Sequence, residues 1–397
     1  MAPRLSPIQS SEDARRGARR RLPRLVFDFV DGAAGRERGA ARNAVAFDAV
    51  LLQPRIMADV AERDLGTALL GRRYGLPLGI APMGMCNLVH PGADRLLAEA
   101  AARFDMPVCT SAAASTRLEE IAGWAGPRAW FQLYFGADAE ASLAMVDRAR
   151  LAGYETLVLT VDVPQVARRL RDLRNGFGLP FRMTPRAAWD FAAHPRWSLA
   201  TLAAGVPRPR NFGDGSGAAR FDRAASRAGA DWAFLARLRE AWPGKLVVKG
   251  VTAPEDARRV RSHGADAVYV STHGGRQLDA APAAITLLPE IRAALGPDFP
   301  ILFDSGLRSG EDVVRALALG ADFVMLGRPV LFALGADGAR GLDSLLAGFR
   351  EDISTAMAQL GVRAVSGIGP HSLHGPAPAA ARGAGGDRAA LQIAGTT

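Results

Sequence analysis

The stretch ILFDSGLRSGEDVVRALALGADFVMLGR, residues 301–328, contains one complete strand–helix–strand unit. Its two ends are short apolar runs, 301–305 and 323–327, and each ends in polar residues or glycine. Between them, residues 309–319 have the apolar spacing of an amphipathic helix. Two strands joined by such a helix run parallel and are connected by a right-handed crossover.

The same unit recurs along most of the chain. Ala-rich helical stretches such as 91–104 and 137–151 separate short apolar runs at 76–82, 107–111, 129–134, 156–162, 246–250, 267–271, 301–305 and 323–327. Near-continuous apolar strands are typical of a sheet that is covered on both faces. Eight units fit a closed barrel of about 250 residues better than an open sheet. The sequence therefore predicts an α/β fold of the (β/α)8 TIM-barrel class.

Segments outside this repeat define the expected domain organisation. We predict a basic tail over residues 1–20, and a barrel domain over 21–374 that starts with a helical extension near 22–31. After the fourth strand, the chain contains a long insertion at about 178–230, rich in aromatic residues, Arg, Pro and Gly, and long loops of this kind are usually functional. The Ala/Gly/Pro-rich end, 375–397, is expected to be disordered.

The positive charge of the chain is unevenly distributed. The net charge is +9, but residues 1–24 carry +5 and residues 165–212 carry +7, so the rest of the chain is slightly negative. This distribution argues against nucleic acid as a partner and favours an anionic membrane surface or an anionic ligand. Two cysteines, no 18-residue apolar run and no signal-peptide core predict a cytoplasmic protein.

Polar side chains or glycines follow all eight predicted strands, at the barrel end where active sites of this fold form. In strand order they are Gly84; Ser111; Gln132 and Tyr134; Thr160 and Asp162; Lys249; Ser271, His273 and Arg276; Asp304, Gly306 and Arg308; and Gly327 and Arg328. Lys249 is one of only two lysines in the chain, which makes its place in a buried strand conspicuous. The histidines show no metal-ligand spacing, so no metal site is predicted.

These residue types indicate a ligand with a ring and a phosphate. The loops after the last two strands are the usual phosphate site of this fold. Ser111, Gln132 and Thr160 can hydrogen-bond the edges of a ring, and Lys249 can stabilise negative charge on it, which suggests flavin mononucleotide (FMN). His273 can accept a proton near neutral pH with Asp162 as its partner, and Arg276 can bind a carboxylate.

With these motifs in view, the sequence resembles the FMN-dependent L-2-hydroxyacid oxidases and dehydrogenases. The resemblance covers about residues 15–370 and rests on SxHGGRQLD (271–279), FQLY (131–134), LTVDVP (159–164), RRLRDLRNGF (168–177), VVKGV (247–251), DSGLRSG (304–310) and LGRPVLF (326–332). It implies oxidation of a small L-2-hydroxy acid to the 2-oxo acid. It also implies FMN as cofactor and a homotetramer.

The resemblance assigns roles to matching positions. His273 would remove a substrate proton with Asp162 as its partner, Arg276 and Arg169 would bind the substrate carboxylate, and Tyr134 would contact the hydroxyl. Gly84 would contact FMN through its backbone. The other FMN contacts would be Ser111, Gln132, Thr160, Lys249 and Ser271 for the ring, and Asp304, Gly306, Arg308, Gly327 and Arg328 for the ribityl chain and phosphate.

Two positions depart from the family pattern. Phe29 stands where the family usually has a tyrosine that helps to bind the substrate carboxylate. A hydrogen bond to a charged group contributes about 1.5–3 kcal/mol, so its loss could weaken small substrates or indicate a more apolar one. Thr272 stands where the family generally has asparagine, which alters the support of the loop but retains the base.

Several functional alternatives remain at this point. The first expectation is an L-lactate dehydrogenase with a quinone-type acceptor, and Phe29, Ala112 and Ala113 keep an aromatic substrate such as L-mandelate as an alternative. Oxygen as acceptor, isomerase or synthase chemistry, and a non-catalytic flavin-binding barrel are further alternatives. The insertion, with HPRW at 194–197, resembles the segment of membrane-associated lactate dehydrogenases, which implies peripheral contact with the inner face of the cell membrane. A mobile surface lid is the equally open alternative for this segment.

Overall fold

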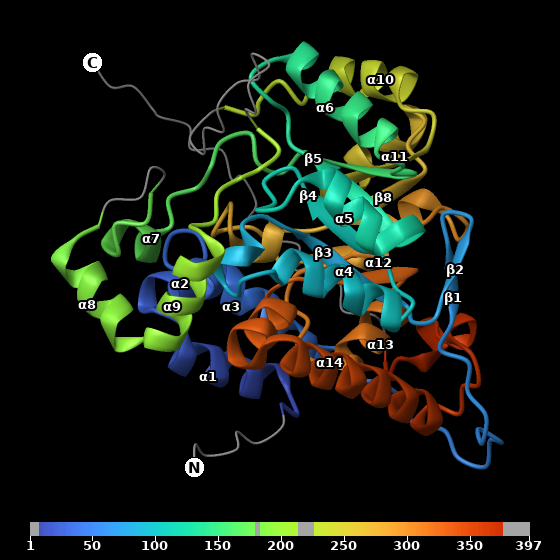
Figure 1. Cartoon of the computed structure of the whole chain (residues 1–397). Helices are drawn as coiled ribbons and strands as arrows, with labels where there is room; N and C mark the ends of the chain where they lie inside the picture. Colours follow the sequence, from blue (N-terminus) through green and yellow to red (C-terminus); the bar gives the residue numbers. More distant parts are fainter. Residues whose placement is uncertain (1–7, 179–182, 213–225, 376–397) are drawn as a thin grey trace, which may run out of the picture.

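The computed structural model describes residues 8–178, 183–212 and 226–375, and its centre is a closed barrel of eight parallel strands (Figure 1). The predicted (β/α)8 fold is therefore confirmed. The strands follow one another around the barrel in chain order, and the last one, β10, pairs with the first, β3. Their bounds are β3 Leu78–Met83, β4 Val108–Ser111, β5 Ala129–Leu133, β6 Thr156–Thr160, β7 Lys245–Val251, β8 Ala267–Val270, β9 Ile301–Phe303 and β10 Phe323–Leu326.

A helix follows each barrel strand and covers its outer face. These helices are α4 Ala93–Arg103, α5 Leu118–Ala125, α6 Ala139–Leu151, α10 Trp232–Ala241, α11 Pro254–Ser262, α12 Leu288–Leu295, α13 Gly310–Ala318 and α14 Arg328–Gln359. The helices expected at 91–104, 137–151 and 309–319 correspond to α4, α6 and α13 within two residues. α13 begins where it does because the Ser309 hydroxyl accepts from the Asp312 amide in a capping box.

The inside of the barrel is filled by every second strand residue. Side chains alternate between the two faces of a strand, so the outward residues pack under the helices and the inward residues form a separate apolar layer. The inward layer contains Ala81, Cys109, Trp130, Val158, Val247, Ala267, Tyr269, Leu302, Phe323 and Met325. A two-stranded antiparallel ribbon, β1 Thr67–Leu69 and β2 Arg72–Tyr74, adds Tyr74 to it, and the Tyr74 hydroxyl accepts from the Trp130 indole at 3.2 Å.

The N-terminal segment differs from the expected basic tail. Residues 11–20 belong to helix α1 (Ser11–Arg21), which lies along α14 and buries Ala14 and Ala18 against the core (Figure 1). Ser10 caps this helix, and its arginines occupy the exposed face, so amphipathic packing orders the segment. The tail prediction is therefore wrong for 11–20, while 1–7 lie outside the described residues. Helices α2 (Arg24–Asp31) and α3 (Arg38–Val45) follow.

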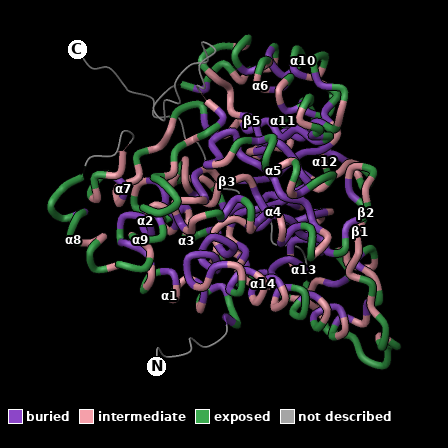
Figure 2. Tube along the Cα trace, in the orientation of Figure 1, coloured by how far each residue is buried: buried purple, intermediate pink, exposed green. Residues whose placement is uncertain are grey.

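The insertion after β6 contains short helices joined by loops. The short helix α7 (Leu170–Arg174) is followed by a pair, α8 (Pro185–Ala193) and α9 (Pro195–Ala204), which projects from one side of the barrel (Figure 1). Most of this pair is exposed (Figure 2), but the Trp197 indole on α9 donates to the Leu88 carbonyl at 3.0 Å and anchors it. Residues 179–182, 213–225 and the predicted disordered segment from 376 onward lie outside the described residues.

Candidate active site

A ring of inward-pointing polar residues lies directly above the apolar layer of the barrel. Each of them stands two positions after an apolar inward residue, so the alternation of the strand itself aims it at the barrel axis. The ring consists of Ser111, Gln132, Thr160, Lys249, Ser271 and Asp304, all of them buried. Strand periodicity and the shared carboxyl end of the barrel therefore bring together six residues that were predicted as cofactor contacts.

Lys249 is the centre of an ionic network in this ring. Its ammonium donates to the Ser271 hydroxyl at 2.7 Å and lies 3.1 Å from the Asp304 carboxylate, which also accepts from Tyr269 at 2.8 Å. Burial alone would lower the pKa of Lys249, but the carboxylates of Asp304 and Asp162 outweigh burial and raise it. The lysine therefore stays charged, with its ammonium in the wall of the cavity.

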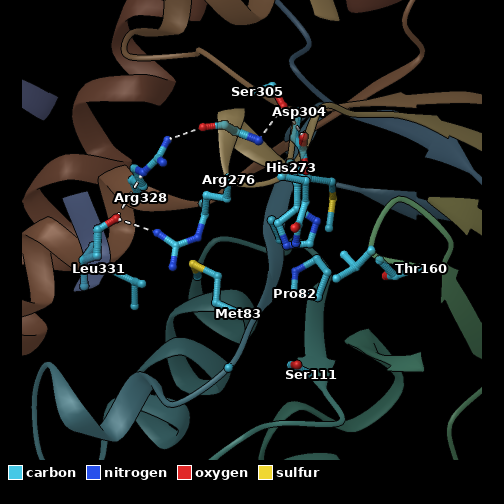
Figure 3. Close-up of a pocket in the computed structure, with 18 of the residues that line it drawn as sticks. Pro82, Met83, Ser111, Thr160, His273, Arg276, Asp304, Ser305, Arg328 and Leu331 are labelled. Carbon is cyan, nitrogen blue, oxygen red and sulfur yellow. Dashed lines mark hydrogen bonds between the residues drawn. The ribbon is translucent and has the colours of Figure 1, made fainter. Parts of the chain in front are cut away.

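His273 and Asp162 form a base-and-orienter pair at the mouth of the barrel. Nδ1 of His273 lies 3.0 and 3.2 Å from the two carboxylate oxygens of Asp162, so the opposite ring nitrogen, Nε2, is directed to the cavity that His273 lines (Figure 3). Burial is the largest effect on His273 and lowers its pKa, although Asp162 opposes this. Burial would raise the pKa of Asp162, but His273 and Lys249 outweigh it and lower that pKa. A neutral imidazole beside a carboxylate is ready to accept a proton.

The loop that carries His273 is held in a tight left-handed turn. His273, Gly274 and Gly275 have φ values of 54°, 61° and 75°, a region that only glycine enters without strain. A Cβ on Gly275 would lie 2.4 Å from the Ala40 amide nitrogen of α3, so the close approach of α3 requires glycine there. The two glycines of the HGGR motif thus allow the chain to turn back immediately after the base.

Ser305 and Thr272 support this loop from behind. The Ser305 hydroxyl accepts from the amides of Thr272 at 3.2 Å and Gly274 at 3.0 Å, one on each side of His273. The Thr272 hydroxyl donates to Asn43 of α3 at 3.1 Å. The threonine therefore supports the loop through its own hydrogen bond, and the departure from the family asparagine leaves the base in place.

Two arginines, Arg308 and Arg328, lie at the end of the cavity formed by the last two strands. Arg328 donates to the carbonyl oxygens of Val30, Gly274 and Gly32 at 2.8–3.1 Å. Burial, together with the charge of nearby Arg308, lowers the pKa of Arg328 to about 10, and burial also lowers the pKa of Arg308. Such a pair favours an anion beside it, because a phosphate would offset both the desolvation and the mutual repulsion.

Arg276 connects the same cavity to the N-terminal extension. Its Nη1 donates to the carbonyl oxygens of Phe29 and Gly32 at 3.0 and 2.8 Å, at the carboxyl end of helix α2. The last carbonyls of a helix carry partial negative charge and lack partners within it, so they attract cations. Figure 3 shows Arg276 and Arg328 on one side of His273 and Thr160 on the other. Helix α2 therefore orients two cations of the cavity.

The remaining wall combines aromatic rings with further arginines. The Phe29 and Phe177 rings lie 4.7 Å apart, and the Arg276 guanidinium lies 5.5 Å from the Phe29 ring. On another side, the Arg227 guanidinium lies 5.1 Å from the centre of the Tyr134 ring. Arg169 lines the cavity as well.

Nearly all the predicted site residues meet in this one cavity. Fourteen of them line it directly: Phe29, Gly84, Ser111, Tyr134, Thr160, Arg169, Lys249, His273, Arg276, Asp304, Gly306, Arg308, Gly327 and Arg328. Asp162, Gln132 and Ser271 stand just behind and contact His273, Ser111 and Lys249 respectively.

Residues 18–375 match the family described as FMN-dependent dehydrogenase. The chain belongs to this family. It is 39% identical to (S)-mandelate dehydrogenase of Pseudomonas putida, over 91% of this chain and 93% of the relative. It is 37% identical to L-lactate dehydrogenase of Pseudomonas syringae pv. syringae, over 91% and 97%. A crystal structure of the monotopic membrane protein (S)-mandelate dehydrogenase superposes with a TM-score of 0.87 at 37% identity, over 93% of this chain and all of that one.

The family uses FMN, and the residues of this dehydrogenase fit that cofactor. The Thr160 hydroxyl and the Gln132 amide nitrogen are buried without a hydrogen-bond partner, as expected of groups that bond to a ring edge. A Cβ on Gly327 would meet nothing within 4 Å, so this glycine leaves space on the cavity side. Arg308 and Arg328 suit the phosphate. Groups that suit the ring and groups that suit the phosphate are therefore both present at this one cavity.

Two residues of the site had not been identified from the sequence. Ser305 stands between the predicted Asp304 and Gly306, and its positive φ of 87°, unusual for a serine, is visible only in the structure. Arg227 is far from every motif, directly after a segment that the structure does not describe, and reaches the cavity because its amide donates to the Pro164 carbonyl at 2.9 Å. No local sequence signal would have identified either residue.

The pKa of His273 leads to a prediction about pH. Because burial lowers that pKa below its ordinary value of 6.5, the imidazole is neutral at pH 7 and becomes protonated only under more acidic conditions. We expect kcat/KM to stay constant from neutral pH down past the ordinary histidine pKa, and to fall roughly tenfold per pH unit only below the lowered pKa of His273. Stopped-flow reduction of the FMN-loaded enzyme across pH measures this. An acidic limb centred above pH 6.5 would contradict a lowered pKa.

Proposed function

We propose that the enzyme oxidises L-2-hydroxy acids with an apolar, ring-sized side chain, for which L-mandelate is the reference, to the corresponding 2-oxo acids. The observation that carries this choice is the aromatic wall beside the carboxylate-binding end of the cavity. There the Phe29 and Phe177 rings pack against each other in a tilted arrangement, and Phe29 lacks the hydroxyl that would serve a small, polar substrate. Ala113, a small residue in the same lining, leaves room for a ring. L-lactate is the runner-up substrate.

The chemistry removes two electrons and two protons from the substrate. FMN, when bound, accepts the two electrons. In our proposal, Nε2 of His273 accepts a substrate proton, and Asp162, already bonded to Nδ1, stabilises the imidazolium that results. These roles are consistent with the lowered pKa of His273 and the lowered pKa of Asp162, which favour a neutral base beside an ionised carboxylate.

The remaining side chains of the cavity would bind and orient the substrate. Arg276 and Arg169 would bind the substrate carboxylate, and the Tyr134 hydroxyl would contact the substrate hydroxyl. Arg276 is preorganised for this task because the carbonyls of α2 fix its guanidinium. Lys249 would stabilise the negative charge that develops on the ring side of the cavity.

A substrate panel tests the proposal directly. The holoenzyme is mixed anaerobically with L-mandelate, L-lactate, glycolate and a branched aliphatic L-2-hydroxy acid, and flavin bleaching is followed by stopped flow. We expect L-mandelate to give the highest kcat/KM, and D-mandelate to serve as the stereochemical control. A preference for L-lactate would support the runner-up, and a lack of bleaching by every L-2-hydroxy acid would contradict the whole proposal.

The Phe29→Tyr substitution should favour the smaller substrate. The added hydroxyl would offer the substrate carboxylate a charge-assisted hydrogen bond of about 1.5–3 kcal/mol, or roughly a 10- to 150-fold gain. We expect kcat/KM for L-lactate to rise at least about tenfold on this basis, with a smaller relative change for L-mandelate. Steady-state kinetics of Phe29→Tyr and of a control, Phe177→Tyr, measure the effect. An unchanged L-lactate rate would show that Phe29 does not face the carboxylate.

The electron acceptor is proposed to be a membrane quinone, reached through contact of α8 and α9 with the bilayer. Exposed Trp189 on α8 and exposed Leu199 and Leu202 on α9 stand beside several arginines, a combination that suits a headgroup interface. Within the residues that the structure describes, no helix is long and apolar enough to span a bilayer. Rapid reoxidation of reduced enzyme by a soluble quinone analogue but slow reoxidation by oxygen would support this acceptor, and the reverse would identify an oxidase.

A further inference from the structure

A second cavity, of about 390 Å³, lies where the insertion meets the barrel. Ligand pockets in proteins usually measure about 300–1,000 Å³, so this one is large enough for a small molecule. It shares no lining residue with the active-site cavity. Its walls are the loop after β4, the turn before α4 and the chain from α9 to Arg210.

Hydrogen bonds fix the geometry of this cavity. The Arg210 amide donates to the Ala114 carbonyl at 3.0 Å. The next residue, Asn211, is buried; its side chain accepts from the Leu118 amide at 2.9 Å and donates to the Thr116 carbonyl at 3.3 Å. The insertion is therefore attached to the barrel on one side of the cavity by backbone and side-chain bonds, and on the other by the Trp197 anchor.

Two hydroxyls in the lining have no hydrogen-bond partner. Ser115, in the loop after β4, and Thr201, on α9, are each 7% exposed and have side-chain oxygens that are buried and unbonded. Buried hydroxyls in folded proteins are almost always hydrogen-bonded, because leaving one unpaired costs free energy. The pair therefore marks a site where a ligand with several acceptor atoms completes the bonding.

The charge of the lining identifies the ligand as an anion. Arg117, Arg208 and Arg210 line the cavity, with Glu120 as the one carboxylate among the lining residues that the structure describes. Arg117 also contacts Glu119 at 3.7 Å, whereas Arg208 and Arg210 are exposed arginines of the insertion. Guanidinium groups combined with hydroxyl donors suit a phosphate, whose oxygens accept several charge-assisted hydrogen bonds at once.

Exposed apolar side chains next to the cavity favour a membrane lipid as the source of such a phosphate. Thr201 lies between Leu199 and Leu202 on α9, and both leucines are exposed. Val206 lines the cavity and is itself 73% exposed. A bilayer that receives these apolar side chains would bring its headgroups to the level of the cavity mouth.

We propose that this cavity binds the phosphate of an anionic phospholipid headgroup and so sets the position of the insertion on the membrane. Arg208 and Arg210 bind the phosphate at the mouth, and the Ser115 and Thr201 hydroxyls donate to it from within. The proposal rests on the membrane contact of α8 and α9 suggested above, and it is independent of the oxidation chemistry.

Vesicle co-sedimentation of the full-length holoenzyme tests the site. The binding partners are vesicles of phosphatidylcholine alone and of phosphatidylcholine with phosphatidylglycerol. The double variant Arg208→Gln/Arg210→Gln is compared with Arg186→Gln/Arg196→Gln, which removes the same charge from exposed positions of α8 and α9 outside the cavity. Binding to the anionic vesicles should fall at least about fivefold more in the cavity variant than in the control, because specific phosphate contacts add to general surface attraction. Equal losses would overturn the site.

A second variant tests the buried hydroxyls without changing any charge. Thr201→Val keeps the shape of the side chain and removes the donor. It should weaken binding to the anionic vesicles about threefold or more, the loss of one hydrogen bond to a charged group, with no change toward the neutral vesicles. Unchanged binding in Thr201→Val would mean that water alone satisfies the hydroxyl and would overturn the proposal.

A titration with soluble phosphates distinguishes the two sources of the phosphate group, a lipid headgroup and a free phosphate in solution. Inorganic phosphate and glycerol 1-phosphate are titrated against the holoenzyme, with binding measured calorimetrically. Weak binding of glycerol 1-phosphate that is lost in Arg208→Gln/Arg210→Gln supports a headgroup site. The opposite outcome is tight binding of inorganic phosphate, together with vesicle binding that is unchanged in both double variants. It would assign the cavity to a soluble phosphate and overturn the lipid assignment. Flavin reduction by 2-hydroxy acids in solution should be unchanged in every cavity variant, so failure of this inference is distinct from failure of the proposed reaction.

Discussion

The His273→Gln variant is expected to bind FMN normally and to lose about 10²–10⁴-fold in the rate of anaerobic flavin reduction, the contribution typical of a positioned general base. Glutamine is close in size and can still hydrogen-bond Asp162, but it cannot accept a substrate proton. The proposed cofactor contacts lie elsewhere in the cavity, on Lys249, Thr160, Arg308 and Arg328. The purified variant should therefore be yellow and catalytically silent.

Stopped-flow bleaching by L-mandelate measures the rate of flavin reduction. The flavin-to-protein absorbance ratio measures how much FMN the variant binds. The matched control is His263→Gln, a half-buried histidine at the end of α11 that lies outside the cavity. It should behave as the unmodified enzyme does. A colourless His273→Gln protein would contradict the separation of base and cofactor contacts. Wild-type bleaching would contradict the role of His273 itself.

The Arg328→Met variant is expected to lose FMN. This arginine lies with Arg308 at the phosphate end of the cavity, and the loss of charged hydrogen bonds of about 1.5–3 kcal/mol should raise the Kd for FMN roughly 10- to 150-fold. The same change removes its bonds to the carbonyls of Val30, Gly274 and Gly32, so some loss of stability should accompany it. Fluorescence titration of the apoprotein with FMN measures the Kd.

A control variant distinguishes a loss of FMN affinity from a general loss of stability. It changes a second arginine, Arg292, which also donates to several backbone carbonyls. Arg292 donates to the carbonyls of Gly320, Gly296 and Phe299 and pairs with Asp322, at the opposite end of the barrel. Arg292→Met should lower the melting temperature of the apoprotein and leave the Kd for FMN unchanged. If both variants lose FMN in proportion to their stability, the phosphate role of Arg328 is wrong.

Much of the fold was predictable because its signals are local. A strand of alternating faces, a helix of regular apolar spacing and a short connection can each be recognised within about 30 residues, as in 301–328. The residues that follow each strand were predictable for the same reason, since parallel strands of a closed barrel all end on one rim. Gln132, Thr160 and Lys249 stand two positions after an apolar inward residue, and the alternation alone aims them at the barrel axis.

Contacts between distant segments were not predictable in this way. The prediction of a tail failed at 11–20 because a short, basic, Ala-containing segment becomes a helix only where α14 offers an apolar surface. Arg227 was missed because it reaches the Tyr134 ring across 93 positions of chain, with no motif around it. The role of α2 as the support of Arg276 and Arg328 depends on carbonyl groups, which every residue carries and no sequence distinguishes.

The amino-acid sequence by itself determined the barrel, the rim at which chemistry takes place and the residue types available there, because these follow from periodicity and from the order of strands. Only the tertiary structure decided which groups act together. It placed Nδ1 of His273 against Asp162, it left the Thr160 hydroxyl and the Gln132 amide nitrogen without partners, and it packed the Phe29 ring against that of Phe177. The physical reason is that hydrogen bonds and burial act over a few ångströms of space, and only the packed barrel brings such distant residues that close.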